Sequence, residues 1–392
     1  MKHQGPKPIR ILRIIARMNI GGPAIQITGL MQNLPRPEFE QVLLYGRCGP
    51  EELDYLDAHK IEFTSIRLEG FGRRISFKSD LKAFLAIRNL IKTFKPDIVH
   101  THTAKAGFIG RLAAISVMRK KIKIHTYHGH LLHGYFSPFI TKIVIWSERL
   151  LAYFSHSLIA VGDKVRNELL QSGIGQPEKY QVIGPGLGIG ELPSRKLSLE
   201  TFGLPNDKFT VTWIGRAVSV KAPHRIIEIA LECVTRGLNV QFVLVGDGPL
   251  LEELRETSQL AKLPIVFLGW QSKIEKILSF SDLVILTSEN EGTPVSLIQA
   301  QLAGIPVLTT DVGSASEVMI DGKTGFCLHY SAKDFAERIE LLANSPELRT
   351  EFIGNSMRNA REKFPINRLV LDHAQLYRNL ISQSKSSSKV PR

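Results

Sequence analysis

The sequence predicts an α/β protein with two Rossmann-like domains, each built on a parallel sheet, that face a central cleft. Short apolar runs rich in β-branched residues recur along the chain, and helix-like segments separate them. This alternation of strand and helix is typical of parallel sheets with crossover helices. The pattern pauses once, in a stretch rich in Gly and Pro at 182–207. A chain of 392 residues also suits two hydrophobic cores better than one.

The predicted strands are apolar without alternation, as expected for strands that are buried on both faces. About five are expected in each half. They lie at 11–15, 41–45, 97–100, 122–126 and 157–161, and then at 210–214, 240–245, 265–269, 282–287 and 305–310. Helices are predicted between them, for example at 81–94, 222–237 and 249–261.

The pause predicts a domain boundary near residue 190. We expect domains at 1–190 and 191–365. A last helix is expected at 366–383. It would pack either on the C-terminal domain or, if the chain crosses back, on the N-terminal domain. The polar tail at 384–392 is predicted to be disordered.

The composition is that of a globular protein with a marked positive charge. Lys and Arg total 50 against 37 Asp and Glu, which gives a net charge of +13. This charge indicates an anionic partner, such as nucleic acid, anionic lipid or a phosphorylated substrate, or simply a solvated basic surface. The three cysteines have no metal-binding spacing, and no apolar run reaches the roughly 18 residues of a membrane span. The expected location is therefore the cytoplasm.

The segment EGTPVSLIQAQLAG follows a predicted strand and combines a carboxylate with a helix start. Thr293 suits the N-cap position and Pro294 the first helical position. Gly292 would let the backbone approach a ligand, and the free N–H groups of the helix start would face an anion such as a diphosphate. Glu291 would accept hydrogen bonds from sugar hydroxyls. An ordinary capped helix with a surface glutamate is the alternative.

Two cations follow the first strand of the second half. Arg216 comes directly after Gly215, and Lys221 lies five residues on, before a predicted helix. Together they would clamp a diphosphate and stabilise the charge that develops when a nucleoside diphosphate leaves. Two exposed cations in a basic protein are the alternative interpretation.

The first half offers a glycine pair and a set of histidines. Gly21 and Gly22 lie between a strand and a helix, where backbone N–H groups would contact a phosphate, or where they would form a plain tight turn. His128 and His130 follow a predicted strand and suit hydrogen bonding to a polar substrate. The His-x-His spacing also invites a metal site, but no third ligand is evident, and we expect neither a metal nor a cofactor.

Taken together, these motifs resemble the family-4 retaining glycosyltransferases of GT-B fold found in bacterial polysaccharide biosynthesis. The resemblance covers nearly the whole chain and is strongest at 288–326. The segments IGRAVSVKAP, LVGDGPLLEEL, HTHTAKAGFIGRLAA and HGHLLHGYFS support it. The resemblance implies transfer of a hexose from a nucleotide-sugar donor, UDP-linked by preference, to a saccharide or polyprenyl-linked acceptor. It places the acceptor in the N-terminal domain and the donor in the C-terminal domain.

The resemblance also assigns roles. Glu291 would contact the donor sugar, His128 would lie near the reacting sugar, and Arg216 with Lys221 would hold the diphosphate. Gln299 stands where the family has a second glutamate that binds ribose; it keeps an acceptor but lacks the charge. Backbone contacts to the donor would come from Gly21, Gly22, Gly269, Trp270, Gly292, Thr293, Pro294 and Val295.

With no evident carboxylate nucleophile, the expected mechanism is a same-face displacement in which the leaving phosphate takes the acceptor's proton. A product of inverted anomeric configuration would contradict it. A nucleotide-sugar epimerase or a phosphorylase on the same scaffold, and a basic nucleic-acid binder, are the alternatives. We expect no nucleic-acid partner, because that interpretation leaves the cleft motifs unexplained. The segments 71–80 and 133–146 mix cations with aromatic residues and would rest on an anionic membrane surface.

Overall fold

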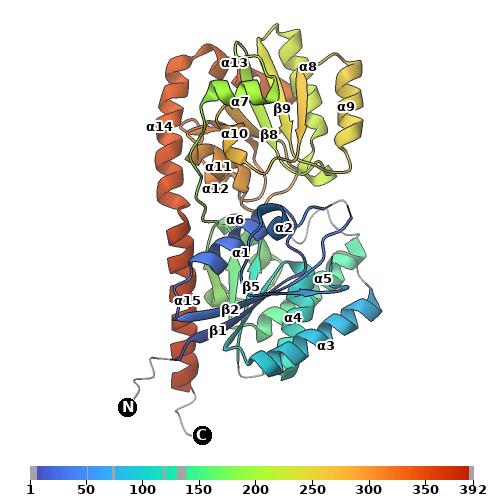
Figure 1. The fold of residues 1–392 in the computed structure, drawn as a ribbon, viewed down its shortest axis with the longest axis vertical. Helices are drawn as coiled ribbons and strands as arrows, with labels where there is room; N and C mark the ends of the chain where they lie inside the picture. The colour runs from blue at the N-terminus through green and yellow to red at the C-terminus, as the bar shows by residue number, and fades with distance from the viewer. Residues whose placement is uncertain (1–6, 51, 73–75, 118–120, 130–137, 388–392) are drawn as a thin grey trace. The chain divides into compact units, whose positions relative to one another are not determined.

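A computed structural model of the chain describes residues 7–50, 52–72, 76–117, 121–129 and 138–387. These residues form two compact units (Figure 1). The N-terminal unit contains the chain up to Gly186 together with the chain from Ile366 onward. The C-terminal unit runs from Leu187 to Pro365. The chain therefore passes between the units twice, once at Gly186 and once at Pro365.

The N-terminal unit is built on a parallel sheet of seven strands in the order β3-β2-β1-β4-β5-β6-β7. Ile9 pairs with Phe39 on one side of β1, and Ile11 pairs with Ile98 on the other. The strands are β1 (Ile9–Ile15), β2 (Phe39–Gly46), β3 (Ser65–Leu68), β4 (Ile98–His102), β5 (Ile122–Tyr127), β6 (Ser157–Ala160) and β7 (Tyr180–Val182).

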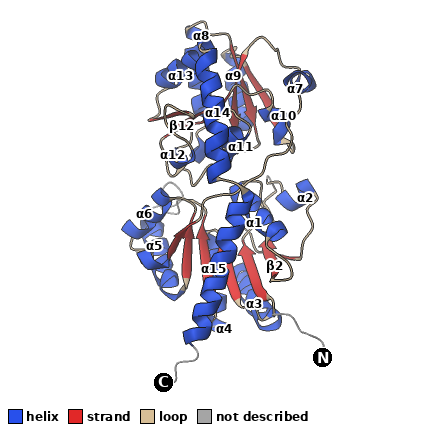
Figure 2. Cartoon of the chain, turned by 90° about the vertical axis from the view of Figure 1, so that its left-hand side faces the viewer, coloured by secondary structure: helices blue, strands red, loops and turns tan. Residues whose placement is uncertain are grey.

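Helices cover both faces of this sheet. The helices are α1 (Gly22–Asn33), α2 (Tyr55–His59), α3 (Phe77–Phe94), α4 (Ala104–Val117), α5 (Pro138–Phe154), α6 (Asp163–Gln171), the short η1 (Pro177–Lys179) and α15 (Ile366–Ser387). Helices α1 and α15 lie side by side on one face of the sheet (Figure 2). On that face Ile11 and Ile98 pack against Leu369 and Tyr377. Helices α3 and α4 cover the other face.

The C-terminal unit has a parallel sheet of six strands in the order β10-β9-β8-β11-β12-β13. Its larger core packs Trp213 and Phe242 of the sheet against buried residues of α8 and α13. The strands are β8 (Phe209–Ile214), β9 (Val240–Val245), β10 (Ile265–Gly269), β11 (Leu283–Leu286), β12 (Val307–Thr310) and β13 (Gly325–Leu328). The helices are α7 (Arg195–Phe202), η2 (Ser219–Lys221), α8 (His224–Thr235), α9 (Leu251–Leu260), α10 (Ile274–Leu278), α11 (Val295–Leu302), α12 (Ala315–Val318), α13 (Ala332–Asn344) and α14 (Pro346–Lys363).

The sheets are wider than the sequence predicts, because three short strands were missed. β3, β7 and β13 lie at sheet edges, have three or four residues each and are only partly buried. Edge strands carry polar residues on their open side and therefore lack the continuous apolar run that marks a central strand. Residues 384–387, which were predicted to belong to a disordered tail, are helical, because α15 spans Ile366–Ser387.

Helix α15 is anchored in the N-terminal unit by both apolar and charged contacts. Leu369 and Tyr377 are fully buried in the core that contains Ile11. Arg368 donates to the carbonyl oxygens of Gly184 and Pro185, and Arg378 forms two hydrogen bonds of 2.6 and 2.7 Å with Glu38. The last segment of the chain therefore completes the core that the first segment begins.

We expect Leu369→Ala to destabilise the N-terminal unit by about 2–5 kcal/mol, because it opens a cavity in that core. The exposed Leu371 lies on the same helix, and Leu371→Ala should change the free energy of unfolding by no more than about 0.5 kcal/mol. Chemical denaturation, with hydrogen exchange of the β1 and β4 amides, measures both. Faster exchange confined to the C-terminal unit would contradict this placement of α15.

Candidate functional site

The C-terminal unit brings two of the predicted site residues into direct contact. Lys221 ends η2, after β8, and Glu291 lies in the loop between β11 and α11. The Lys221 Nζ is 2.5 Å from Glu291 Oε1, and the hydroxyl of Ser288 donates to the same oxygen at 2.6 Å. Only 7% of Glu291 is exposed. Because both donors bind Oε1, the structure holds the carboxylate in one orientation.

Hydrogen bonds between the two loops explain why Lys221 and Glu291 meet. The Glu289 N–H donates to the Val220 carbonyl at 2.9 Å. The Thr287 hydroxyl lies 3.2 Å from the carbonyl oxygens of both Lys221 and Ala222. Arg225 of α8 donates to the Thr287 carbonyl at 2.8 Å, so the β8–α8 and β11–α11 loops are held together along their length.

Helix α11 begins one residue later than the sequence predicts. Its first residue is Val295, and Pro294 rather than Thr293 occupies the N-cap position, with a ψ of 112°. That extended ψ keeps Pro294 outside the helix, although its φ of −71° would suit the first turn. The N–H groups of the first turn have no acceptor within the helix, and the positive end of the helix dipole lies there. The helix start therefore remains suited to an anion.

Gln299 lies one turn into α11, is half-buried, and accepts the N–H of Ala303 through its backbone oxygen. No hydrogen bond joins its side chain to Glu291 in the described part of the chain. The structure therefore places this predicted site residue in the same loop–helix segment as Glu291, but apart from the ion pair.

The remaining predicted residues of this unit lie on loops that follow adjacent strands. The Gly215 N–H donates to Val245, and the Gly246 N–H donates to Gly269 at 2.8 Å. Arg216 lies in the first of these loops and Trp270, half-buried, in the third. Gly246 has a φ of +137°, and a Cβ atom there would lie 1.7 Å from the Gly215 oxygen. The close approach of these loops therefore requires glycine at this position.

In the N-terminal unit, the predicted glycines lie where β1 leads into α1. Gly21 occupies the N-cap position with a φ of +157°, Gly22 is the first helical residue and Pro23 follows. No acidic residue lies in the first turn of α1. This helix start is thus open to an anion on geometric and electrostatic grounds.

His128 follows β5 and pairs with a histidine of the neighbouring strand. Its Nε2 is 3.0 Å from Nδ1 of His102, the last residue of β4. Burial lowers the pKa of His128 to about 4, so the ring is neutral at pH 7. Two neutral rings joined in this way share one proton, and the tautomer of His102 sets that of His128.

A buried arginine anchors this histidine network. Arg13 of β1 donates through Nη1 to Nδ1 of His100 at 3.1 Å and through Nε to Gln41. The Tyr377 hydroxyl also lies 2.9 Å from that Nδ1. Nδ1 of His100 is therefore an acceptor, and its Nε2–H donates to the Thr126 hydroxyl at 2.7 Å. Burial, with the charge of Arg13, holds the pKa of His100 well below its usual value.

Sequence reasoning missed Ser288, Arg13 and Tyr377. It also missed His373, whose ring stacks on that of His100 with 6.0 Å between the ring centroids. A cation inside the apolar run of β1 was visible in the sequence, and His373 and Tyr377 stand at helical i, i+4 spacing. His373 and Tyr377 contact His100 of β4 only because α15 returns to the first sheet. Ser288 belongs to the segment 288–326 in which the resemblance is strongest, but only the hydrogen bond from its hydroxyl to Glu291 shows that it is part of the contact.

The histidines that the structure describes do not form a recognisable metal site. Within the ranges that the structure describes, no group of three or more His, Cys, Asp or Glu side chains is arranged to hold a metal ion. His130 and His133 lie outside the described residues. The described helices also include none that is long and apolar enough to cross a membrane.

Two family models match the chain and divide it much as the contacts do. The model for glycosyltransferase family 4 matches residues 20–189, and the model for group 1 glycosyl transferases matches residues 194–359. One similar protein is the UDP-Gal:alpha-D-GlcNAc-diphosphoundecaprenol alpha-1,3-galactosyltransferase of Escherichia coli, 28% identical over 77% of this chain and 79% of its own. The capsular polysaccharide biosynthesis glycosyltransferase CapM of Staphylococcus aureus is 27% identical over 80% of this chain and 84% of its own.

Solved structures share the fold at low sequence identity. Anabaena Alr3699/HepE in complex with UDP and glucose superposes with a TM-score of 0.77 at 19% identity, over 95% of this chain and 100% of that one. Sucrose-phosphate synthase from Thermosynechococcus elongatus superposes with a TM-score of 0.79 at 18% identity, over 95% and 99%. These likenesses confirm the predicted fold class of two Rossmann-like domains.

The close approach at Gly246 yields a stability prediction. We expect Gly246→Ala to destabilise the C-terminal unit by at least about 3 kcal/mol, because the new Cβ would displace backbone in the β8–α8 loop. Gly237 has a φ of +69° but open space around it, so Gly237→Ala should cost only about 1–2 kcal/mol. Urea denaturation of both variants checks this, and equal losses would rule out the steric explanation.

The buried histidines make the N-terminal unit sensitive to acid. Burial lowers the pKa of His128 to about 4 and that of His373 to about 3, whereas histidines of the unfolded chain titrate near 6.5. The unfolded chain therefore binds more protons in this window, and the free energy of unfolding should fall as the pH drops from about 6.5 to 5. Each histidine contributes about 1.4 kcal/mol per pH unit.

Urea denaturation of the N-terminal unit at several pH values measures this slope. His373→Leu should make the slope shallower by about one proton. A free energy of unfolding that stays constant between pH 7 and 5 would show that these histidines are not held neutral.

Proposed function

The chain belongs to the group 1 glycosyltransferases, with a family 4 domain in its N-terminal half, and we propose that it retains the anomeric configuration of the sugar it transfers. The donor is a nucleotide sugar, and UDP is the favoured nucleotide. The acceptor is a saccharide or a polyprenyl-linked saccharide of envelope or extracellular polysaccharide synthesis. The observation that carries this proposal is the Lys221–Glu291–Ser288 contact beside the start of α11.

The geometry of this contact suits a donor sugar bound next to its diphosphate. Lys221 and Ser288 both bind Oε1 of Glu291, which leaves Oε2 to accept a hydrogen bond from a sugar hydroxyl. The start of α11 follows four residues after Glu291 and supplies backbone N–H groups for the phosphates. Arg216 adds a planar, permanently charged donor in the β8–α8 loop.

In the proposed reaction the bond between the anomeric carbon and the phosphate oxygen breaks. The acceptor oxygen then forms its bond to the anomeric carbon on the same face, and its proton passes to the leaving phosphate. Arg216, Lys221 and the N–H groups of α11 stabilise the charge that grows on that phosphate. His128 is neutral, so it orients a sugar hydroxyl through a hydrogen bond and adds no charge of its own.

The donor and acceptor classes draw support from named relatives. Anabaena Alr3699/HepE was solved with UDP-glucose, and the Escherichia coli relative is named for UDP-Gal and a diphosphoundecaprenol-linked sugar. The site is proposed to need no metal, because Arg216, Lys221 and the start of α11 can together neutralise a diphosphate. A GDP-sugar is the alternative donor. The epimerase, phosphorylase and nucleic-acid interpretations find no favouring contact in the described residues.

A donor screen by thermal stabilisation tests the proposal. We expect one UDP-sugar to raise the Tm of the purified protein, and both Glu291→Ala and Arg216→Ala to abolish that rise, because each removes a contact to the donor. Glu289→Ala is the matched control, since Glu289 lies two residues from Glu291 but is exposed and faces Arg225. Its shift should match that of the unmodified protein.

The same screen can contradict the proposal in two ways. A rise in Tm that survives Glu291→Ala and Arg216→Ala would place the donor elsewhere in the molecule. If the Tm rises with no UDP-sugar, GDP-sugar or free nucleotide, the protein does not bind a donor. The replacement of the family's second glutamate by Gln299 would then be a sign of a site that has lost donor binding.

A further inference from the structure

Three helices of the N-terminal unit carry large apolar side chains on their outer surface. Helices α3 and α5 both contact α4, which lies between them on one face of the sheet. Phe77 is 83% exposed, Trp146 is 66% exposed and Tyr153 is 73% exposed, although each is large and apolar or aromatic. The exposed residues, here called the α3–α5 surface, are Phe77, Leu81, Leu85, Phe108, Phe139, Ile143, Trp146, Leu150 and Tyr153.

Five of the exposed apolar and aromatic residues of α5 form a continuous stripe. They recur at intervals of four, three, four and three residues from Phe139 to Tyr153, which places them on one side of the helix. A stripe with this period normally faces the core. In α5 this stripe is exposed, and other residues contact the core, such as Leu151 and Ala152, which are fully buried.

A buried ion pair fixes which side of α5 faces outward. Glu148 is fully buried, accepts two hydrogen bonds of 2.7 and 2.6 Å from Arg111 of α4, and accepts a third from the Tyr127 hydroxyl. Trp146 and Leu150 are each two residues from Glu148, about 200° around the helix. Turning the stripe inward would pull a paired carboxylate out of its site, which is strongly unfavourable.

Helix α3 is held in a comparable way. Asp80 forms an ion pair of 2.6 Å with Lys105 of α4. Phe77, Leu81 and Leu85 recur every four residues on α3 and remain exposed. The apolar residues of α3 and α5 are thus presented by helices that are each locked to α4, rather than by mobile side chains on a loop.

These helices carry several exposed basic side chains and few acidic ones. Asp80 and Glu148 are the only acidic residues of α3, α4 and α5, and both are engaged in ion pairs. Lys78, Lys82 and Lys142 are exposed beside the apolar residues. A surface with apolar and aromatic side chains, several lysines and no unpaired carboxylate matches the chemistry of an anionic lipid headgroup layer above acyl chains.

We propose that the α3–α5 surface docks this protein on an anionic membrane, with the aromatic residues at the depth of the headgroups. A second copy of the chain is a poorer occupant, because a two-fold interface would bring together two copies of the same surface, which carries exposed lysines and no unpaired carboxylate. The proposal does not depend on sugar transfer. Of the segments that the sequence singled out for membrane contact, residues 73–75 and 130–137 lie outside the described residues.

Vesicle flotation of the full chain tests the surface directly. The vesicles contain phosphatidylcholine alone or phosphatidylcholine with phosphatidylglycerol. We expect binding to the anionic vesicles, and at least a tenfold loss of binding in Trp146→Ser/Tyr153→Ser. The matched control is Leu231→Ser/Leu260→Ser, which removes two exposed leucines from the C-terminal unit and should float as the unmodified protein does.

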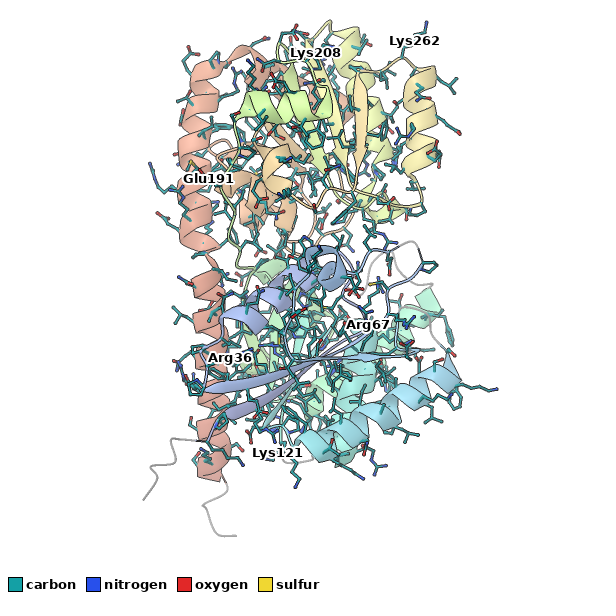
Figure 3. The ribbon with its side chains drawn as sticks, in the orientation of Figure 1. Arg36, Arg67, Lys121, Glu191, Lys208 and Lys262 are labelled. Carbon is teal, nitrogen blue, oxygen red and sulfur yellow. The ribbon has the colours of Figure 1, made fainter. Side chains whose placement is uncertain are left out.

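A second pair of variants tests the charge. Lys82→Glu/Lys142→Glu should weaken binding at least fivefold, whereas Lys262→Glu/Lys333→Glu, on the C-terminal unit, should not (Lys262 is labelled in Figure 3). All four variants change exposed side chains, and unchanged circular dichroism and Tm confirm that they fold. Thermal shifts with UDP-sugar, read separately, show that the donor site is intact.

Several results would overturn the proposal. These are the absence of flotation with anionic vesicles, equal binding to neutral vesicles, or equal losses in the surface variants and their controls. Light scattering supplies a fourth: a dimer that Trp146→Ser/Tyr153→Ser converts to monomer would identify a second copy as the occupant.

Discussion

Burial of parallel strands on both faces is the constraint from which most of this structure follows. Such strands carry mainly apolar side chains, and the polar ones that they do carry, such as Arg13 and His100, are paired with one another inside the fold. Polar groups that can meet a ligand therefore concentrate in the loops at the carboxyl ends of the strands. In the C-terminal unit these loops are joined to one another by backbone hydrogen bonds, from Gly215 to Val245 and from Gly246 to Gly269. Further hydrogen bonds join the β8–α8 and β11–α11 loops, from the Glu289 N–H to Val220 and from Arg225 to Thr287. These bonds hold together the two loops in which Glu291 and Lys221, 70 residues apart, meet at 2.5 Å.

The Lys221–Glu291 pair also affects which groups would neutralise a bound diphosphate. A lysine that is bound to a carboxylate contributes less net charge to a diphosphate than a lysine without such a partner. In the proposed site, more of the neutralisation would then come from Arg216 and from the dipole of α11. In return the pair fixes the orientation of the carboxylate that is proposed to bind the sugar, and Ser288 reinforces this orientation. Positioning of the sugar and binding of the phosphate would thus be coupled through one oxygen atom.

The sequence could predict what local patterns determine. The central strands, the β8–α8 and β11–α11 loops and the resemblance to family-4 glycosyltransferases all follow from contiguous residues, and the comparisons confirm that resemblance and the fold class. The edge strands lacked an apolar signal, and the first residue of α11 depended on the ψ angle of Pro294. The histidine network was beyond such reasoning. His100 and Tyr377 are 277 residues apart, and their contact exists only because α15 returns to the first sheet.

The net charge of +13 shows why composition alone leaves the partner open. The same lysines would serve a nucleic acid, a phosphorylated substrate or a lipid surface, and only their neighbours distinguish these cases. Arg216 and Lys221, the cations that are proposed to bind phosphate, lie in the segment between β8 and α8 and would act together with the backbone N–H groups of the α11 start. The lysines of α3 and α5 lie instead among exposed aromatic and aliphatic side chains, while the acids of those helices are turned inward to Arg111 and Lys105. A nucleic acid would gain little from so wide an apolar stripe, whereas a bilayer gains from the stripe and the lysines together.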